Sequence, residues 1–359
     1  MLTPSFWQNK RVLVTGHTGF KGAWISYWLH LMGATVKGIA LPPPTKPNLF
    51  EALNLSEFIQ SDLLDIRDFS ALDRSISEFQ PEVLLHLAAQ PLVRYSYREP
   101  LETYAVNVMG TAHVLESCRK VPSLKSIVII TTDKCYENKE WVWGYRETDP
   151  MGGYDPYSSS KGCAELVTAA YRRSFYAHTP EVGLASTRAG NVIGGGDWAE
   201  DRLVPDLIRA FSRGEVVHVR HPRSTRPWQH VLEPLGGYLL LAEKLYSDPQ
   251  RFSSGYNFGP LDHDCVDVET LVRQLSAAWG EEASFNIDGG NHPHEAQFLK
   301  LDISKARQEL GWAPRWGLNR NLTEVARWYR HFYDQNSSVE SMRSLTKEQI
   351  ANFVESPML

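Results

Sequence analysis

The sequence predicts an α/β protein in which a doubly wound parallel sheet is joined to a smaller, mixed α/β C-terminal domain. Three observations support this fold class. Short β-rich runs alternate with segments of helical period through the first half of the chain, a glycine-rich turn follows the first run, and beyond about residue 190 short strands are separated by glycine and proline. Such alternation requires crossover helices, and therefore a parallel sheet.

The expected elements follow from these patterns in chain order. We expect β-strands at 11–15, 35–41, 83–88, 126–131 and 183–188. Apolar residues at three-to-four spacing predict helices at 23–32, 69–79, 104–119 and 157–176, and again at 204–212 and 235–246.

These elements suggest a division of the chain with soft boundaries. Residues 1–190 form the sheet domain, to which 230–260, including the run SGYNFG, return. Residues 191–229 and 261–333 form the smaller cap domain, and 334–359 are expected to be a polar tail with one short helix.

Composition excludes several classes of protein. The 359 residues are 42% hydrophobic and 22% charged, as in soluble globular proteins, and the net charge of −5 offers no basic field for nucleic acid. The four cysteines contain no CxxC pair, so neither a metal site nor a disulfide framework is indicated. No stretch approaches the roughly 20 apolar residues of a membrane helix, and the N-terminus is unlike a signal peptide. We expect a soluble, cytoplasmic protein with no membrane partner.

A glycine-rich turn lies between the first predicted strand and the first predicted helix. Gly16, Gly19 and Gly22 are spaced as GxxGxxG. Small residues let the backbone approach a pyrophosphate, whose charge is then met by the amides and positive dipole end of the helix. The turn therefore predicts a Rossmann-type dinucleotide site; a tight turn without a ligand is the alternative.

The identity of the dinucleotide is less firmly indicated. The segment IALPPPTKP after the second strand lacks the acid that usually binds the adenosine ribose. It also lacks an arginine for a 2′-phosphate, so we favour NAD over NADP, although Lys46 leaves the choice open. Asp62 either contacts the adenine or begins the following helix. The predicted cofactor contacts are Gly16, His17, Thr18, Gly19, Phe20, Gly22, Asp62, Leu63, Leu87, Ala88, Ala89, Gln90, Asn107, Tyr157 and Lys161.

Tyr157 and Lys161 are four residues apart in a predicted helix, so their side chains share one face. A nearby ammonium stabilises phenolate, which allows the tyrosine to take a hydroxyl proton while hydride leaves the adjacent carbon. The lysine can also bind the nicotinamide ribose. Thr132, Asp133 and Lys134 follow the strand 126–131, at the edge where open α/β sheets hold ligands.

In this order, the motifs GHTGFKG, HLAAQ, YxxxK, TRAGNVIGGGDW and RPWQHVLE resemble the extended short-chain dehydrogenases, and among them the nucleotide-sugar 4,6-dehydratases. The resemblance covers about residues 10–328. The segments TTDKCYEN and LPPPTKPNLFE are similar to the branch that acts on CDP-glucose. Related enzymes have glutamate where this chain has Lys134, which puts the role of that position in doubt.

The resemblance implies oxidation at carbon 4 of the glucosyl unit, loss of water across carbons 5 and 6, and return of the hydride to carbon 6. Tyr157 would be the base at the carbon 4 hydroxyl, supported by Lys161, and Thr132 would orient that hydroxyl. Asp133 would protonate the departing hydroxyl, and Lys134 would take the carbon 5 proton if its pKa were lowered. Without the resemblance, a strand-end ion pair between Asp133 and Lys134 is the simpler interpretation.

The resemblance also implies substrate contacts and partners. Asn191 and Arg226 would bind the sugar and pyrophosphate, while Arg202, Arg220 and His294 are weaker candidates at the nucleotide end; an exposed Arg226 without contacts is the alternative. The family usually forms a homodimer through a four-helix bundle, here from 97–119 and 157–176; a higher oligomer is the alternative. Deoxysugars of a bacterial surface polysaccharide, such as O-antigen lipopolysaccharide, are the implied products.

Two other functions remain open. A nucleotide-sugar 4-epimerase of the same fold would use Tyr157 and Lys161 but would not need an acid at Asp133. A non-catalytic dinucleotide sensor would need none of these groups, and the intact Thr132, Tyr157 and Lys161 argue against it.

Overall fold

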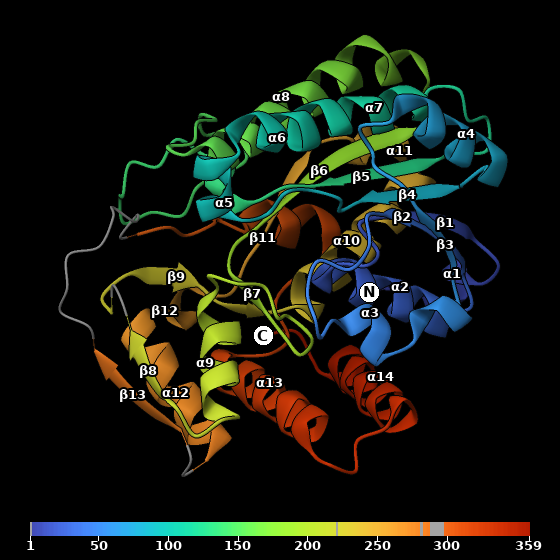
Figure 1. Cartoon of the computed structure of the whole chain (residues 1–359). Coiled ribbons are helices and arrows are strands. Elements are labelled where there is room, and N and C mark those ends of the chain that lie inside the picture. Colours follow the sequence, from blue (N-terminus) through green and yellow to red (C-terminus); the bar gives the residue numbers. More distant parts are fainter. Residues whose placement is uncertain (1, 220–221, 281–282, 288–297) are drawn as a thin grey trace.

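The computed structural model of the chain describes residues 2–219, 222–280, 283–287 and 298–359 (Figure 1). Its centre is a seven-stranded sheet in the order β11-β6-β5-β4-β1-β2-β3, in which every pairing is parallel. The strands are β1 Arg11–Thr15, β2 Thr35–Ala40, β3 Gln60–Leu63, β4 Val83–His86, β5 Ser126–Ile130, β6 Gly183–Ala189 and β11 Gly255–Phe258. The predicted Rossmann-type sheet is confirmed.

Helices cover both faces of this sheet (Figure 1). Along β1, Val12 and Val14 belong to one buried cluster and Leu13 to another, as the alternation of side chains along a strand requires. The first cluster includes α2 Phe20–Leu31 and α10 Leu232–Ser247; the second includes α4 Phe69–Phe79 and α7 Gly110–Cys118. On the second side α8 Pro156–Ser174 packs against α7 and α6 Pro100–Tyr104.

Smaller elements form the cap beside the carboxyl ends of the strands (Figure 1). Three two-stranded sheets pair β7 Val192–Ile193 with β10 Gln229–His230, β9 Thr225–Pro227 with β12 Cys265–Asp267, and β8 Val216–Val219 with β13 Ser284–Ile287. The helices of this region are α9 Leu203–Phe211, α12 Val268–Trp279 and α13 Leu318–Tyr333. Short helices elsewhere are α1 Pro4–Trp7, α3 Leu49–Ala52, α5 Val93–Arg98 and α11 Pro249–Phe252.

Two predicted elements need correction. Asp62 lies within β3 and does not begin a helix; the following helix α4 is capped instead by Asp68, whose carboxylate accepts a hydrogen bond from the Ala71 amide at 3.1 Å. The helix expected at 104–119 contains a π-helical turn at Ala105–Met109 before α7 begins at Gly110.

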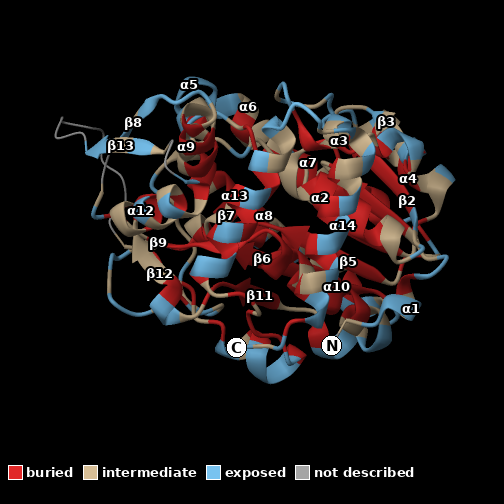
Figure 2. Cartoon of the chain, turned by 90° about the horizontal axis from the view of Figure 1, so that it is seen from below, coloured by how far each residue is buried: buried red, intermediate tan, exposed pale blue. Residues whose placement is uncertain are grey.

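The prediction of a polar tail with one short helix at 334–359 is wrong, because this segment forms a long helix that packs on the rest of the chain. Residues Val339–Glu355 form a long helix, α14, that begins with a capping box between Ser338 and Ser341. Met342, Leu345, Ile350 and Phe353 form its buried face, and the Phe353 ring meets Trp28 of α2 and Trp316 edge-on. The apolar face of α14 was hard to recognise in the sequence, because polar residues occupy most other positions of the helix. Figure 2 shows that buried residues lie on the inward faces of the helices.

Candidate active site

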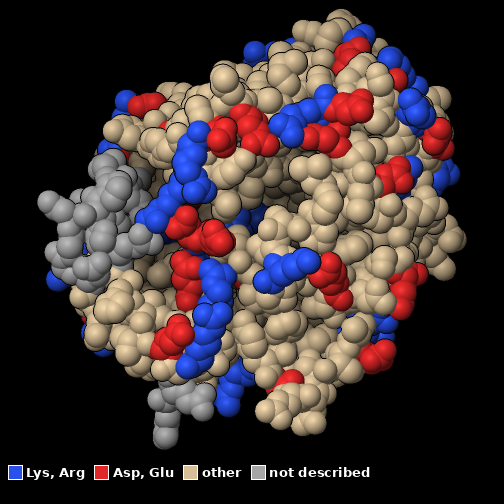
Figure 3. Space-filling view, in the orientation of Figure 1, with Lys and Arg blue, Asp and Glu red and all other residues tan. Residues whose placement is uncertain are grey.

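The main cleft lies between the carboxyl ends of the parallel strands and the cap. Its volume is about 2030 Å³, and Figure 3 shows the hollow with charged side chains around its rim. The strand order reverses between β1 and β4, the point at which open α/β sheets bind ligands. Because ordinary small-molecule pockets measure roughly 300–1,000 Å³, this cleft has room for two nucleotide-sized ligands.

The glycine turn has the backbone geometry that a dinucleotide needs. Gly16 has a φ of +79°, and a Cβ there would lie 2.7 Å from the Ala88 nitrogen. A Cβ on Gly22 would lie 2.0 Å from the Gly16 carbonyl oxygen, so the turn packs directly on the first turn of α2. The amides at the start of α2 and the small residues before them therefore fit a pyrophosphate group.

The predicted cofactor contacts divide into two groups. Gly16, Thr18, Gly19, Phe20, Gly22, Leu87, Ala88 and Ala89 line the cleft, together with Tyr157 and Lys161. His17, Asp62, Leu63, Gln90 and Asn107 do not belong to that lining. Direct contact of these five residues with a cofactor stays a prediction.

Several of these five side chains are held by protein partners. Asp62 forms an ion pair with Lys37 at 2.8 Å and accepts a hydrogen bond from the Ser75 hydroxyl at 2.6 Å. Asn107 accepts a hydrogen bond from the Gln90 amide at 2.8 Å and donates to the Ser160 hydroxyl at 2.8 Å. Asn107 therefore ties the loop after β4 to α8.

The five predicted catalytic residues come together in the cleft. Thr132, Asp133 and Lys134 follow β5, while Tyr157 and Lys161 project from the same face of α8. The Lys161 ammonium donates to the Ile130 carbonyl at 3.2 Å. The Thr132 hydroxyl donates to the Asp133 carboxylate at 3.0 Å and also interacts with the Tyr157 hydroxyl.

Burial controls the ionisation of the tyrosine and lysine. It raises the pKa of Tyr157 to about 12, against the interaction with the Thr132 hydroxyl and the positive charge of Arg202. It lowers the pKa of Lys161 to about 8, against the negative charge of Glu165. Arg202, which the sequence assigns to the substrate, is thus a cation that favours the Tyr157 phenolate.

The surroundings of Asp133 favour its role as a proton donor. Burial raises the pKa of its carboxyl group against the charge of Lys134 and the hydrogen bond from Thr132. Its Oδ2 atom has no hydrogen-bond partner within the described residues, and a Cβ on Gly190 would lie 2.9 Å from it. Among those residues Asp133 and Lys134 form no ion pair, so the simpler interpretation of the two as a strand-end pair is not supported.

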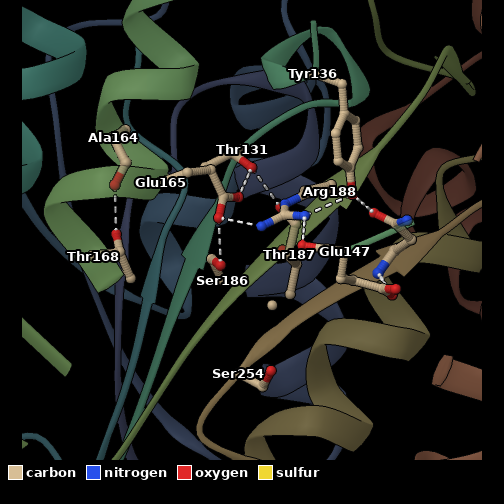
Figure 4. Close-up of polar contacts among 12 residues, drawn as sticks. Thr131, Tyr136, Glu147, Ala164, Glu165, Thr168, Ser186, Thr187, Arg188 and Ser254 are labelled. Carbon is tan, nitrogen blue, oxygen red and sulfur yellow. Dashed lines mark hydrogen bonds and ion pairs between the residues drawn. The ribbon is translucent and has the colours of Figure 1, made fainter. Parts of the chain in front are cut away.

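A buried polar network, absent from the sequence predictions, anchors the catalytic helix (Figure 4). One turn beyond Lys161, Glu165 of α8 pairs with Arg188 of β6 at 2.8 Å. The Glu165 carboxylate also accepts hydrogen bonds from the hydroxyls of Thr131, at 2.5 Å, and Ser186, at 2.7 Å. Arg188 donates to the Tyr136 hydroxyl at 2.6 Å. An arginine as the only charged residue of the buried strand GLASTRA was the available sequence signal.

The substrate candidates lie on the cap side of the cleft. Asn191, Arg202 and Arg226 line it, and Arg202 pairs with Asp197 at 2.8 Å. Arg226 is buried and donates to the Thr225 carbonyl at 2.9 Å, so the alternative of an exposed arginine without contacts is wrong. Arg220 and His294 lie outside the described residues. Lys21, which also lines the cleft, was missed although it stands inside the glycine motif.

Comparison with known proteins gives consistent matches. A family model described as GDP-mannose 4,6 dehydratase matches residues 13–325. The chain is 55% identical over 358 residues, or 99% of both chains, to a protein of Salmonella typhimurium described as CDP-glucose 4,6-dehydratase. It is 24% identical to a dTDP-glucose 4,6-dehydratase of Xanthomonas campestris, covering 88% of this chain and 92% of that protein.

Solved structures show a similar fold. A UDP-glucose 4-epimerase of Thermotoga maritima with UDP-glucose superposes with a TM-score of 0.78 at 24% identity, covering 90% of this chain and 100% of that one. A UDP-glucose 4-epimerase of Thermus thermophilus in complex with NAD gives a TM-score of 0.76 at 23% identity, covering 89% and 99%.

Proposed function

The chain belongs to the GDP-mannose 4,6-dehydratase family, and from this premise we propose that it is an NAD-dependent CDP-glucose 4,6-dehydratase. This hydro-lyase converts CDP-glucose to CDP-4-keto-6-deoxyglucose and water. The observation that carries the proposal is the buried Asp133 carboxyl, because dehydration needs an acid at carbon 6 and epimerisation does not. The nucleotide follows the described activity of the relative that is 55% identical.

The glycine turn and the start of α2 would hold the pyrophosphate of NAD, and Lys161 would bind its nicotinamide ribose. When bound, NAD would supply the hydride acceptor and donor of the reaction. No arginine lines the turn after β2, which favours NAD over NADP, whereas Lys46 lines the cleft there.

The side chains of the cleft supply the proton transfers. Tyr157 takes the proton of the carbon 4 hydroxyl, which Thr132 orients by hydrogen bonding. Burial opposes the phenolate, so the positive charge of Arg202 supports this step. Lys161, on the same face of α8, would add its own positive charge when the phenolate forms.

Elimination then uses Asp133 and Lys134, the two residues that follow Thr132 in the chain. The carbon 4 ketone acidifies carbon 5, whose proton would pass to the amine of Lys134 in its neutral form. As the carbon 5 to carbon 6 double bond forms, the carbon 6 to oxygen bond breaks, and Asp133 gives its proton to the departing oxygen, which leaves as water. The unpartnered Oδ2 atom of Asp133 supports this role.

Residues on the cap side would bind the substrate diphosphate. Arg202 and Arg226 bring guanidinium groups to the cleft, and Asn191 follows β6 beside them. Arg220 and His294 stay predictions for the nucleotide end. We retain 1–190 with 230–260 as the cofactor domain, and 191–229 with 261–333 as the substrate domain.

Product analysis with a panel of donors tests the function. We expect purified protein to convert CDP-glucose, but not dTDP-glucose, UDP-glucose or GDP-mannose, to a product lighter by one water. The 4-keto product is followed by its absorbance in alkali and by mass. Water loss from another donor would contradict the nucleotide assignment, and an isomeric sugar of unchanged mass would show an epimerase.

A single-atom change tests the proposed base. Tyr157→Phe removes the phenolic oxygen that takes the carbon 4 proton, so we expect kcat for dehydration to fall at least about 100-fold. The control is Tyr246→Phe on α10, whose hydroxyl contacts Glu82 and Lys10. Dehydration at the wild-type rate by the Tyr157 variant would remove this residue from the mechanism.

We propose that the chain forms a homodimer through the helices at 97–119 and 157–176. Large apolar side chains are exposed on α6, on the following π-helical turn and on α8: Leu101, Met109 and Leu166 are 84%, 53% and 60% exposed. Such side chains on neighbouring helices are typical of a covered surface.

Measurement of the oligomeric state tests whether this surface is the dimer interface. We expect light scattering to give twice the chain mass for the wild type and a monomer for Leu101→Glu/Leu166→Glu, because buried charges would oppose association. Val354→Glu, on α14 far in the sequence from this surface, serves as the control. A monomeric wild-type protein at micromolar concentration would contradict the dimer.

The cellular setting is also a proposal. The described part of the chain contains no helix long and apolar enough to cross a bilayer, and its four cysteines are unpaired. Unpaired cysteines are typical of a reducing compartment, so we propose a cytoplasmic enzyme. A role in supplying deoxysugars for a bacterial surface polysaccharide is proposed from the described activity of the 55% identical relative.

A further inference from the structure

Lys21 is a basic residue of the cleft that the proposed mechanism does not use. It is the second residue of the twelve-residue helix α2, directly after the glycine turn, and it lines the cleft. Its side chain is half-buried. No hydrogen bond or ion pair to its ammonium group is found within the described residues.

The ammonium of Lys21 adds a third positive charge to a cluster of two cations and two carboxylates. The cations that act on it are Lys161 of α8 and Arg202 before α9, and the carboxylates are Asp133 and Asp197. Asp197 is already paired with Arg202 at 2.8 Å, and burial raises the pKa of Asp133. The start of α2 adds the positive end of the helix dipole.

We propose that Lys21 binds a phosphate oxygen of a diphosphate that occupies the cleft. The inference rests on the proposed function only in requiring that nucleotides occupy this cleft. Both NAD and a nucleotide sugar carry a diphosphate, and the experiment below separates these two sources.

The ionisation of Lys21 gives this proposal a measurable signature. Burial and the charges of Arg202 and Lys161 lower the pKa of Lys21 to about 7. A bound diphosphate brings negative charge and must raise that pKa. At pH 8, where the free lysine is largely neutral, binding therefore takes up about one proton; at pH 6, where it is already charged, uptake is small. Lys161 titrates nearby, so the contribution of Lys21 is isolated by substitution.

Calorimetric titration in buffers of different ionisation enthalpy measures this proton uptake at pH 6 and pH 8. In one arm NAD is titrated into the full-length protein, and in the other CDP is titrated into protein saturated with NAD. The variants are Lys21→Met and Lys21→Arg, and the control is Lys347→Met at an exposed position of α14.

In one of the two arms we expect Lys21→Met to lose the additional uptake at pH 8 and to bind about 10- to 100-fold more weakly, as expected for a lost hydrogen bond to a charged group. Lys21→Arg should restore affinity without the additional proton uptake of the wild type, because arginine stays charged. The affected arm identifies the diphosphate as that of NAD or that of the nucleotide sugar.

Unchanged affinity and unchanged proton uptake of Lys21→Met in both arms would overturn the proposal, and so would retention of the additional proton uptake by Lys21→Arg. If Lys21→Met does not fold, Lys21→Arg alone decides through its proton uptake. Water loss from CDP-glucose by the wild type is measured separately, so a failure of the proposed reaction is distinguished from a failure of this binding role.

Discussion

The buried ion pair between Glu165 and Arg188 is the constraint on which the active site depends. It joins the catalytic helix α8 to β6 at 2.8 Å, and Thr131 and Ser186 complete the hydrogen bonds of the carboxylate. Glu165 lies one helical turn beyond Lys161, so fixing Glu165 fixes the face of α8 that presents Tyr157 and Lys161. Thr131, held by the same carboxylate, directly precedes Thr132. One network therefore fixes the positions of Tyr157, Lys161 and Thr132 relative to one another.

The topology of the sheet determines where this chemistry takes place. Because the strand order reverses between β1 and β4, the glycine turn, the end of β5 and the start of α8 face the same cleft, and the cap closes its other side. Burial there acts in opposite directions on acids and bases: it favours the protonated form of Asp133 and the neutral form of Lys161. The charge of Arg202 in turn lowers the pKa of Tyr157, which favours its phenolate.

Local patterns explain which parts could be predicted from the sequence. The bounds of β1 and α4, the glycine turn, and the pairing of Tyr157 with Lys161 were correct because each depends on a spacing of a few residues. β3 was missed because QSDL has no apolar run, and the buried face of α14 is spread over a mostly polar segment. The roles of Lys21, Arg202 and the pair between Glu165 and Arg188 depend on residues distant in sequence, which spacing does not reveal.

Substitution of Glu165 by glutamine tests the central constraint most directly. It leaves the Arg188 charge buried without a counter-ion, so we expect the free energy of unfolding to fall by roughly 3–5 kcal/mol and kcat of the folded fraction to fall with it. Glu181→Gln, at an exposed position before β6, should change neither quantity. Wild-type stability and wild-type kcat in Glu165→Gln would show that the ion pair does not position the catalytic helix.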